Sequence, residues 1–191
     1  NRDRSAVSGI ADIPSVDTGV RANTTCFFSG RAWFAAHSEV YYSQIIDDKS
    51  KAGLCFQEAD PTSEDISDLI DSDGGNIPIP EATNIVKLLA FSNGVFVFAT
   101  NGVWFIGGGN SGFSATDIQI TKVSPYGTNN PDAIVQVSES VLWWSEIGIQ
   151  ALEQASGQFG PIPGKFGNTN IAEQTIQSFY NSIPEESKAK A

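Results

Sequence analysis

The stretch FSNGVFVFATNGVWFIGGG, residues 91–109, holds two aromatic-rich runs on either side of the turn sequence TNG. Aromatic and β-branched residues around a short Asn-Gly turn are typical of a β-hairpin. The glycines Gly107, Gly109 and Gly112 also spell G-x-G-x-x-G, which raises the alternative of a nucleotide site. The pattern in the rest of the chain decides between these two interpretations.

Two other stretches have the layout of residues 91–108. They are FSGRAWFAAHSEVYYSQI at 28–45 and VSESVLWWSEIGIQALEQ at 137–154, and each holds two apolar runs around a short polar or glycine turn. We therefore expect three antiparallel hairpins. Aligning their turns gives three columns: Phe34, Phe98 and Trp144; Ser38, Gly102 and Gly148; and Tyr41, Phe105 and Ala151.

The spacing of these hairpins predicts a β-propeller-like repeat. Phe98 and Trp144 are 46 residues apart, close to the period of about 40–50 residues that four-stranded propeller blades show. Phe34 and Phe98 are 64 residues apart, and the excess of 18 equals the length of the acidic stretch at 60–77. The sequence therefore predicts an all-β fold with three recognisable blades and an acidic insertion at 60–77.

The other segments are arranged around this β domain, which we place at residues 26–168. Residues 1–25 are polar, with scattered glycine and proline, and predict an N-terminal arm or linker. Residues 185–191 would begin a further, truncated repeat. The sequence starts at Asn1 and contains no methionine, and three blades are fewer than the four to eight that close a propeller. We therefore expect part of a longer product.

Helix signals are scarce. One short helix is predicted at 169–184, where Asn170 would be the cap and Glu173 occupies the capping-box position. A weaker helix pattern falls at 61–70, with Asp60 as its cap.

Composition and charge limit the classes of function. The chain is 40% hydrophobic, which suffices for a core, and its net charge is -11 without any lysine or arginine run. Strong nucleic-acid binding needs a basic surface, so this class is excluded. No run of about 18 apolar residues could span a membrane. Cys26 and Cys55 lie in no motif, and we expect reduced thiols, with a disulfide as the alternative in a secreted protein.

The glycine motif and the single histidine both favour scaffold roles. A dinucleotide site needs a helix after G-x-G-x-x-G, but the residues at 113–124 alternate as a strand does. His37 is the only histidine and falls in a predicted hairpin turn, without a G-x-S-x-G elbow anywhere. We therefore interpret the glycines as a loop and His37 as a turn residue.

The acidic insertion raises two further possibilities. Asp71, Asp73 and Asn76 could supply oxygen ligands to calcium, although Asn76 and Ala82 stand where an EF-hand needs glycine and glutamate. A non-EF calcium loop stays open, beside the preferred interpretation as a solvated loop. Glu64 and Asp65 are sequence neighbours, which does not supply two carboxylates across a glycosidase cleft. We assign no catalytic, cofactor-binding or metal residues.

The four tryptophans, Trp33, Trp104, Trp143 and Trp144, recur inside the hairpins. Sugar-stacking platforms are one interpretation, but large side chains inside repeated strands fit packing between sheets better. Trp143 and Trp144 are adjacent, so one must face each side of its strand. We therefore expect the third sheet to be covered on both faces.

The order of several segments resembles the tail nozzle, or tail tubular protein B, family of short-tailed bacteriophages. The segments are GRAWFAA with VYYSQ, DGGNI, IVKLLAFSNGVFVFATNGVWFIGG, VSPYGTNNPDAIVQVSESVLWWSEIGIQAL and TIQSFYNSIP, and they cover residues 31–184. In that family a β-propeller-like platform lies within a longer chain. Six copies form a ring that extends the portal and adaptor channel, binds tail fibres, retains DNA and conducts it during ejection.

The resemblance implies a virion protein that assembles in the host cytoplasm and is not an enzyme. It implies a homo-oligomer whose partners are tail adaptor and tail fibre proteins, with DNA passing through unbound. Acidic channel walls would let DNA slide, since DNA is itself polyanionic. Two alternatives stay open: a propeller module that binds a carbohydrate or protein receptor, and, third, a propeller hydrolase.

Overall fold

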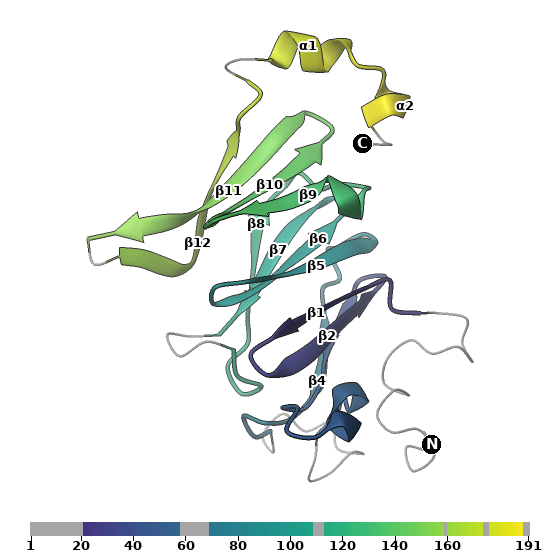
Figure 1. Cartoon of the computed structure of the whole chain (residues 1–191), viewed down its shortest axis with the longest axis vertical. Coiled ribbons are helices and arrows are strands. Elements are labelled where there is room, and N and C mark those ends of the chain that lie inside the picture. The colour runs from purple at the N-terminus through teal and green to yellow at the C-terminus, as the bar shows by residue number, and fades with distance from the viewer. Residues whose placement is uncertain (1–20, 58–68, 109–112, 159, 174–175, 189–191) are drawn as a thin grey trace.

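The computed structural model describes residues 21–57, 69–108, 113–158, 160–173 and 176–188. These residues form an all-β fold of three four-stranded antiparallel sheets, followed by two short helices, α1 (Gln177–Ser182) and α2 (Glu185–Lys188). Figure 1 shows the three sheets stacked in chain order, with the third sheet beside the helices. The predicted all-β, propeller-like succession of hairpin sheets is confirmed.

Each sheet is a meander in which consecutive strands are neighbours. The first sheet contains β1 (Thr24–Phe28), β2 (Arg31–Ala36), β3 (Glu39–Tyr42) and β4 (Gly75–Pro78). The second contains β5 (Ile85–Phe91), β6 (Gly94–Ala99), β7 (Gly102–Gly107) and β8 (Gln119–Ser124). The third contains β9 (Ile134–Val137), β10 (Ser140–Ser145), β11 (Gly148–Gly157) and β12 (Gly160–Asn170). Two 3-10 turns, η3 (Lys49–Gly53) and η5 (Pro131–Ala133), lie in the connections.

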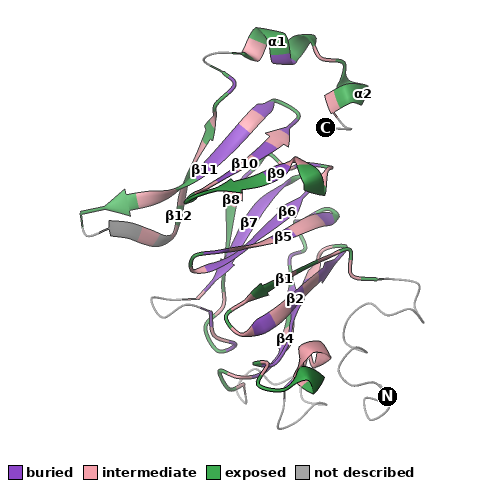
Figure 2. Cartoon of the chain, in the orientation of Figure 1, coloured by how far each residue is buried: buried purple, intermediate pink, exposed green. Residues whose placement is uncertain are grey.

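The middle sheet is covered on both faces. Every residue of β6 and β7 is buried, and Figure 2 shows this burial at the centre of the stack. Side chains alternate between the faces of a strand, so Val97 packs toward the first sheet and Phe98 toward the third. Because both faces of the sheet are covered, the sequences of β6 and β7 are continuous apolar runs and do not alternate with polar residues.

Aromatic contacts join the sheets. On the first interface, Trp33 lies 4.6 Å from Phe113 between ring centroids, in an edge-on arrangement. On the second, Phe98 lies 5.6 Å from Trp143, and Phe166 of β12 lies 4.9 Å from Phe96. Offset and edge-on aromatic pairs each add about 1 kcal/mol beyond the area they bury, so these clusters fix the stacking.

The strand registers correct the first hairpin in the predicted columns. The closing pairs are Ala36 with Glu39, Ala99 with Gly102, and Ser145 with Gly148. The equivalent residues are therefore Ala35, Phe98 and Trp144; Glu39, Gly102 and Gly148; and Tyr42, Phe105 and Ala151. Phe34, Ser38 and Tyr41 were each aligned one position too early.

The physical reason for this shift lies in the turns. In the second and third hairpins the positive φ falls on the glycine after the loop, at 159° for Gly102 and 152° for Gly148. In the first hairpin it falls inside the loop, on His37 at 54°. Matching the small residue Ser38 to the glycines therefore moved the first hairpin by one residue, which exchanges the two faces of a strand.

Two segment boundaries also need correction. Residues 75–77 of the predicted insertion belong to β4, where Ile77 is buried in the core. Residues 58–68, including most of the weaker helix pattern and the pair Glu64 and Asp65, lie outside the described residues. β1 begins at Thr24, so the last two residues assigned to the N-terminal arm join the first sheet.

The C-terminal helix is shorter than predicted. Asn170 pairs with Gln150 and therefore continues β12, and its Oδ1 accepts a bond of 3.1 Å from the amide of Ala172. The helix α1 begins only at Gln177. Asn170 thus ends a strand instead of capping a helix, because the neighbouring strand offers its backbone a partner. Of residues 185–191, the described part forms α2.

Candidate functional site

A buried arginine organises one end of the first sheet. The guanidinium of Arg31, at the start of β2, is 1% exposed. Its Nη1 donates to the carbonyl oxygens of Ser43 (2.7 Å), Asp73 (2.5 Å) and Ser72 (3.3 Å), and its Nη2 donates to that of Asp71. A single cation therefore binds four backbone carbonyls of the connections on either side of residues 58–68.

Aromatic rings enclose the same guanidinium. The Tyr42 and Phe113 rings each lie 5.6 Å from its central carbon, a cation–π distance. Burial lowers the pKa of Arg31, while the neighbouring groups Tyr42, Asp73 and Asp71 raise it. Burial also raises the pKa of Tyr42 to about 12. Arginine keeps its charge in proteins, so Arg31 is a permanent cation held between carbonyl oxygens and two aromatic rings.

Asp71 extends this cluster to the segment before β8. Its Oδ1 accepts bonds of 2.5 Å from Ser114 Oγ and from Thr116 Oγ1. These hydrogen bonds, that of Ser114 first, lower the pKa of Asp71. The carboxylate therefore ties the connection before β4 to that before β8.

The described residues do not bring the predicted calcium ligands together. Asp71 binds two hydroxyls, Asp73 Oδ2 accepts from the amide of Ile70 at 3.0 Å, and Asn76 is exposed on β4. In the described ranges no group of three or more His, Cys, Asp or Glu side chains could hold a metal.

The glycine motif and His37 have the surroundings expected of scaffold residues. Gly107 ends β7, Gly109 and Gly112 lie outside the described residues, and residues 119–124 form β8 instead of a helix. His37 lies exposed in the β2–β3 loop, where its carbonyl oxygen accepts from the Ile85 amide at 2.6 Å. The prediction of a turn residue at His37 is confirmed.

Three of the four tryptophans pack between the sheets, as expected from the sequence. Trp33, Trp104 and Trp143 are at most 2% exposed and belong to the two inter-sheet clusters. Trp144 faces the other side of β10, where its ring lies 5.2 Å from that of Tyr180 in α1. None of the three buried rings offers a surface to a sugar.

The last of the residues considered from the sequence are the two cysteines. Cys26 and Cys55 are not joined by a disulfide in the structure, and burial raises the pKa of Cys26 to about 12. The raised pKa favours the uncharged thiol at Cys26, which is the less reactive form.

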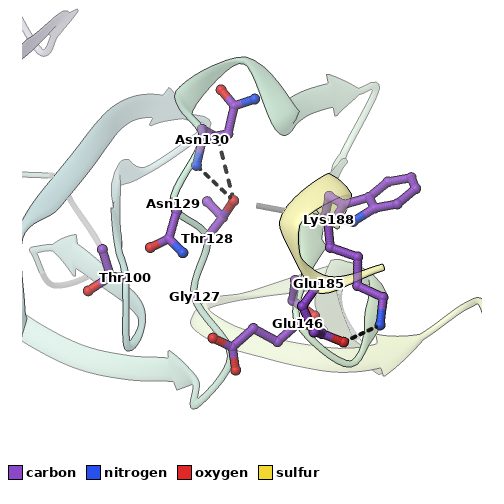
Figure 3. A pocket seen from close by; sticks show the side chains of 10 residues that line it. Thr100, Gly127, Thr128, Asn129, Asn130, Glu146, Glu185 and Lys188 are labelled. Carbon is purple, nitrogen blue, oxygen red and sulfur yellow. Dashed lines mark hydrogen bonds and ion pairs between the residues drawn. The ribbon is translucent and has the colours of Figure 1, made fainter. Parts of the chain in front are cut away.

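A cavity of about 210 Å³ lies between the loop after β8, the β10–β11 loop and α2. Figure 3 shows Glu185 paired with Lys188, at 2.7 Å, and the amide of Asn130 bonded to Thr128 Oγ1 at 3.3 Å. The described lining includes no His or Cys, and its serine, Ser145, donates to the Gly148 carbonyl. The described lining therefore holds no Ser–His or Cys–His pair; its two carboxylates are Glu146 and Glu185, and the second is paired with Lys188.

One end of the stack is acidic. We call it the hairpin end: it holds the β2–β3, β6–β7 and β10–β11 loops, and the connections at 79–84 and 125–133 run along it. Its exposed acidic side chains are Glu81, Asp132, Glu146, Glu185 and Glu186. Lys188 there is paired with Glu185, and Lys87 donates to the carbonyl oxygens of Pro131 and Ile134. The exposed acidic side chains outnumber these two cations, so the hairpin end would repel a polyanion.

Exposed apolar side chains gather at the two outer sheets. Val135 and Val137 of β9 are 54% and 51% exposed, and Phe27 of β1 is 63% exposed. The sequence patterns did not single these residues out, nor Arg31. The alternation of side chains within β9 and β1 would have identified Val135, Val137 and Phe27 if the sequence had shown that these strands belong to the outer sheets of the stack.

No protein-family model matches this chain, and no curated protein matches it significantly. In the part of the chain that the structure describes, no helix is long and apolar enough to cross a membrane. The fold and its surfaces are therefore what a proposal of function rests on.

Proposed function

We propose that this chain is a structural component of a short-tailed bacteriophage tail, where it forms part of the nozzle or tail tube. Copies of it would surround a channel that retains the genome and then conducts it during ejection. In this role the chain is a virion protein, is not an enzyme, and holds neither cofactor nor metal.

The observation that carries this proposal is the succession of three four-stranded meander sheets. The sheets occur in chain order, at the segments on which the resemblance to the nozzle family depends. A propeller-like platform is the fold that this family implies. Fold alone does not determine function, so the surfaces supply the second support.

The charge distribution agrees with a channel that does not grip DNA. The net charge of the chain is -11, and acidic side chains gather at the hairpin end. A duplex attracted to basic walls would release counterions and bind, which would slow its passage. Acidic surfaces avoid this attraction.

The alternative function, a propeller module for a carbohydrate or protein receptor, has less support. Its sugar platforms would be tryptophans, but Trp33, Trp104 and Trp143 are buried between sheets. A hydrolase has still less support, because the described lining of the cavity holds no Ser–His or Cys–His pair, and one of its two carboxylates, Glu185, is paired with Lys188.

Immuno-electron microscopy of the parent phage tests the proposal. Antibodies against the purified chain should label the tail of intact virions, and disrupted virions should release labelled rings with a central channel. Tail-less heads are the control and should stay unlabelled. Label confined to the host surface or the medium would contradict a tail role and would favour a receptor-binding module.

A further inference from the structure

A second cavity, of about 430 Å³, lies where the loop after β8 meets β11, β12 and the residues that follow β12. Small-ligand pockets measure about 300–1,000 Å³, whereas one water molecule occupies only ~30 Å³. The described lining includes four side-chain amides, one aromatic ring and one carboxylate: Gln150, Asn168, Asn170, Gln177, Tyr126 and Glu173. The cavity therefore has the size and the polar groups of a ligand site.

Strand register places two of these amides on the face of the third sheet that packs on the second. Gln150 of β11 pairs with Trp143 of β10, and Asn168 of β12 pairs with Leu152 of β11. Directly paired residues of antiparallel strands lie on the same face, and Trp143 and Leu152 belong to the core between the second and third sheets. Gln150 and Asn168 thus interrupt an apolar face at the edge of this core.

Each of the two amides keeps one buried polar atom without a partner among the described residues, Nε2 of Gln150 and Oδ1 of Asn168. The Gln150 side chain is 1% exposed. Asn168 donates from its other amide atom, Nδ2, to Ser124 Oγ at 2.9 Å, and Ser124 Oγ itself donates to the Tyr126 carbonyl. Native proteins leave few buried polar atoms unpaired, because each one is unfavourable. The cavity therefore offers one free donor beside one free acceptor.

This pair of atoms selects the chemistry of a ligand. A cation offers no acceptor and would leave Gln150 Nε2 unpaired. An anion offers no donor for Asn168 Oδ1, and it would meet Glu173 without any lysine, arginine or histidine in the described lining. A hydroxyl group both donates and accepts, so two neighbouring hydroxyls satisfy both atoms at once.

Tyr126 adds an aromatic surface to these polar groups. It is 40% exposed, and its backbone carbonyl is held by a bond of 3.1 Å from Trp143 Nε1. A ligand with several hydroxyls and an apolar ring face fits an aromatic ring beside amides. An extended peptide fits less well, because peptides that add to a sheet bind the backbone groups of an edge strand, whereas the free groups here are side-chain amides on a sheet face.

We propose that this cavity binds a neutral saccharide. Adjacent hydroxyls of one sugar ring bond to Gln150 Nε2 and Asn168 Oδ1, the ring packs against Tyr126, and the exposed carboxylate of Glu173 accepts from a further hydroxyl. Because Gln150 Nε2 is shielded from solvent, the Gln150 amide turns toward the sugar as it binds. The site uses none of the four tryptophans, and the inference holds whether or not the protein belongs to a phage tail.

Nuclear magnetic resonance of the nitrogen-labelled chain tests the proposal, with the methyl glycosides of glucose, galactose and mannose as probes. At least one of them should shift the side-chain amide signals of Gln150 and Asn168 in a saturable titration. Gln150→Met keeps the length of the side chain and removes the free donor, so it should weaken binding about tenfold or more. Since Gln150 Nε2 has no partner in the fold, this variant should stay folded, which circular dichroism checks.

Tyr126→Ala removes the aromatic surface and keeps the backbone bonds of residue 126, so it should also weaken binding without unfolding the chain. Phe27→Ala is the matched control, because it removes an aromatic ring that is 63% exposed on β1 of the first sheet; it should bind as the unchanged protein does. Absence of a saturable shift with all three glycosides overturns the proposal. Binding that neither Gln150→Met nor Tyr126→Ala weakens overturns it too. Shifts of the same signals by N-acetylalanine methylamide, a blocked peptide unit, and by none of the sugars would assign the cavity to a peptide.

Discussion

Gly127 lies where the connection between the second and third sheets crosses the β6–β7 loop. A Cβ at this position would lie 2.6 Å from the carbonyl carbon of Thr100 and closer still to the carbonyl oxygen of Ala99. These are backbone atoms, and the Thr128 amide donates to the same Ala99 oxygen at 3.2 Å. The crossing therefore has no side chain that could move aside for a methyl group.

We expect Gly127→Ala to destabilise the fold by about 2 kcal/mol, the usual range for overpacking, and to lower Tm by roughly 4–8 °C. Thermal unfolding followed by circular dichroism measures both. Gly167→Ala is the control, because a Cβ at Gly167 meets nothing within 4 Å. Equal melting temperatures for the two variants would show that the crossing adapts, contrary to this expectation.

Arg31 satisfies four carbonyl oxygens that the connections around it leave without strand partners. Arg31→Met keeps much of the side-chain volume but removes every donor, so buried carbonyls lose their hydrogen bonds at about 1–3 kcal/mol for each one left unsatisfied. We expect a loss of about 3 kcal/mol or more in urea unfolding. The exposed Lys165→Met should change stability by less than about 0.5 kcal/mol. Similar losses in both variants would contradict the structural role of Arg31.

Asp71 makes stability depend on pH. Its hydrogen bonds to Ser114 and Thr116 depress its pKa in the folded state, so its stabilising contribution is present above the unfolded-state pKa of about 3.9 and is lost as the pH falls further. Asp71→Asn should therefore melt below the unchanged protein at pH 7, and the difference should shrink toward pH 2. Ser114→Ala should show the same trend, and a difference that is constant with pH would refute this assignment.

At the scale of the elements, α1 is attached to the third sheet through its buried residue Tyr180 and through Gln177, whose Nε2 donates to the Ile147 carbonyl at 2.9 Å and whose Oε1 accepts from Asn170 Nδ2 at 3.2 Å. Tyr180 is 1% exposed, contacts the Trp144 ring, and donates from its hydroxyl to the Ser145 carbonyl, whereas its neighbour Phe179 is 67% exposed. Tyr180→Ala should release the helix while the sheets stay folded, because no residue of the sheets changes. Hydrogen exchange should then accelerate at the amides of Tyr180 and Ile183 alone. Phe179→Ala is the matched control and should leave their exchange rates unchanged.

The strands were predictable where both faces of a sheet are buried. Continuous apolar runs in β6 and β7 have no other stable environment, so their sequence alone indicates a central sheet. β4 was missed because its four residues, GNIP, include glycine and proline and follow an acidic loop. Its assignment depends on pairing with β3, a contact between residues more than 30 positions apart. The helix at 169–184 was overextended for the same reason, since pairing with β11 outcompetes the capping pattern at Asn170.

The candidate surfaces were less predictable than the strands. Arg31 is an isolated basic residue in the sequence, and its role depends on carbonyls from residues 43 and 71–73. Val135, Val137 and Phe27 follow ordinary strand alternation, and only the order of the sheets shows that their faces lie at the ends of the stack. The position of a face in the stack depends on contacts between residues distant in sequence, and the periodicity within one strand does not predict these contacts.

For the whole molecule, the acidic hairpin end should determine how the protein meets DNA. Glu81 comes from the β4–β5 connection and Glu146 from the β10–β11 loop, and both are exposed. The unchanged protein should not bind duplex DNA even at low salt, because its charge repels phosphates. Glu81→Lys with Glu146→Lys should create binding that weakens steeply with salt, with a slope of about -0.9 for each phosphate contacted.

Glu139→Lys with Glu153→Lys changes the net charge equally at exposed positions away from the hairpin end. Fluorescence anisotropy with a labelled duplex compares the two pairs. Stronger binding by the hairpin-end pair locates the repulsion there, whereas equal binding by both pairs would show that net charge alone keeps DNA away.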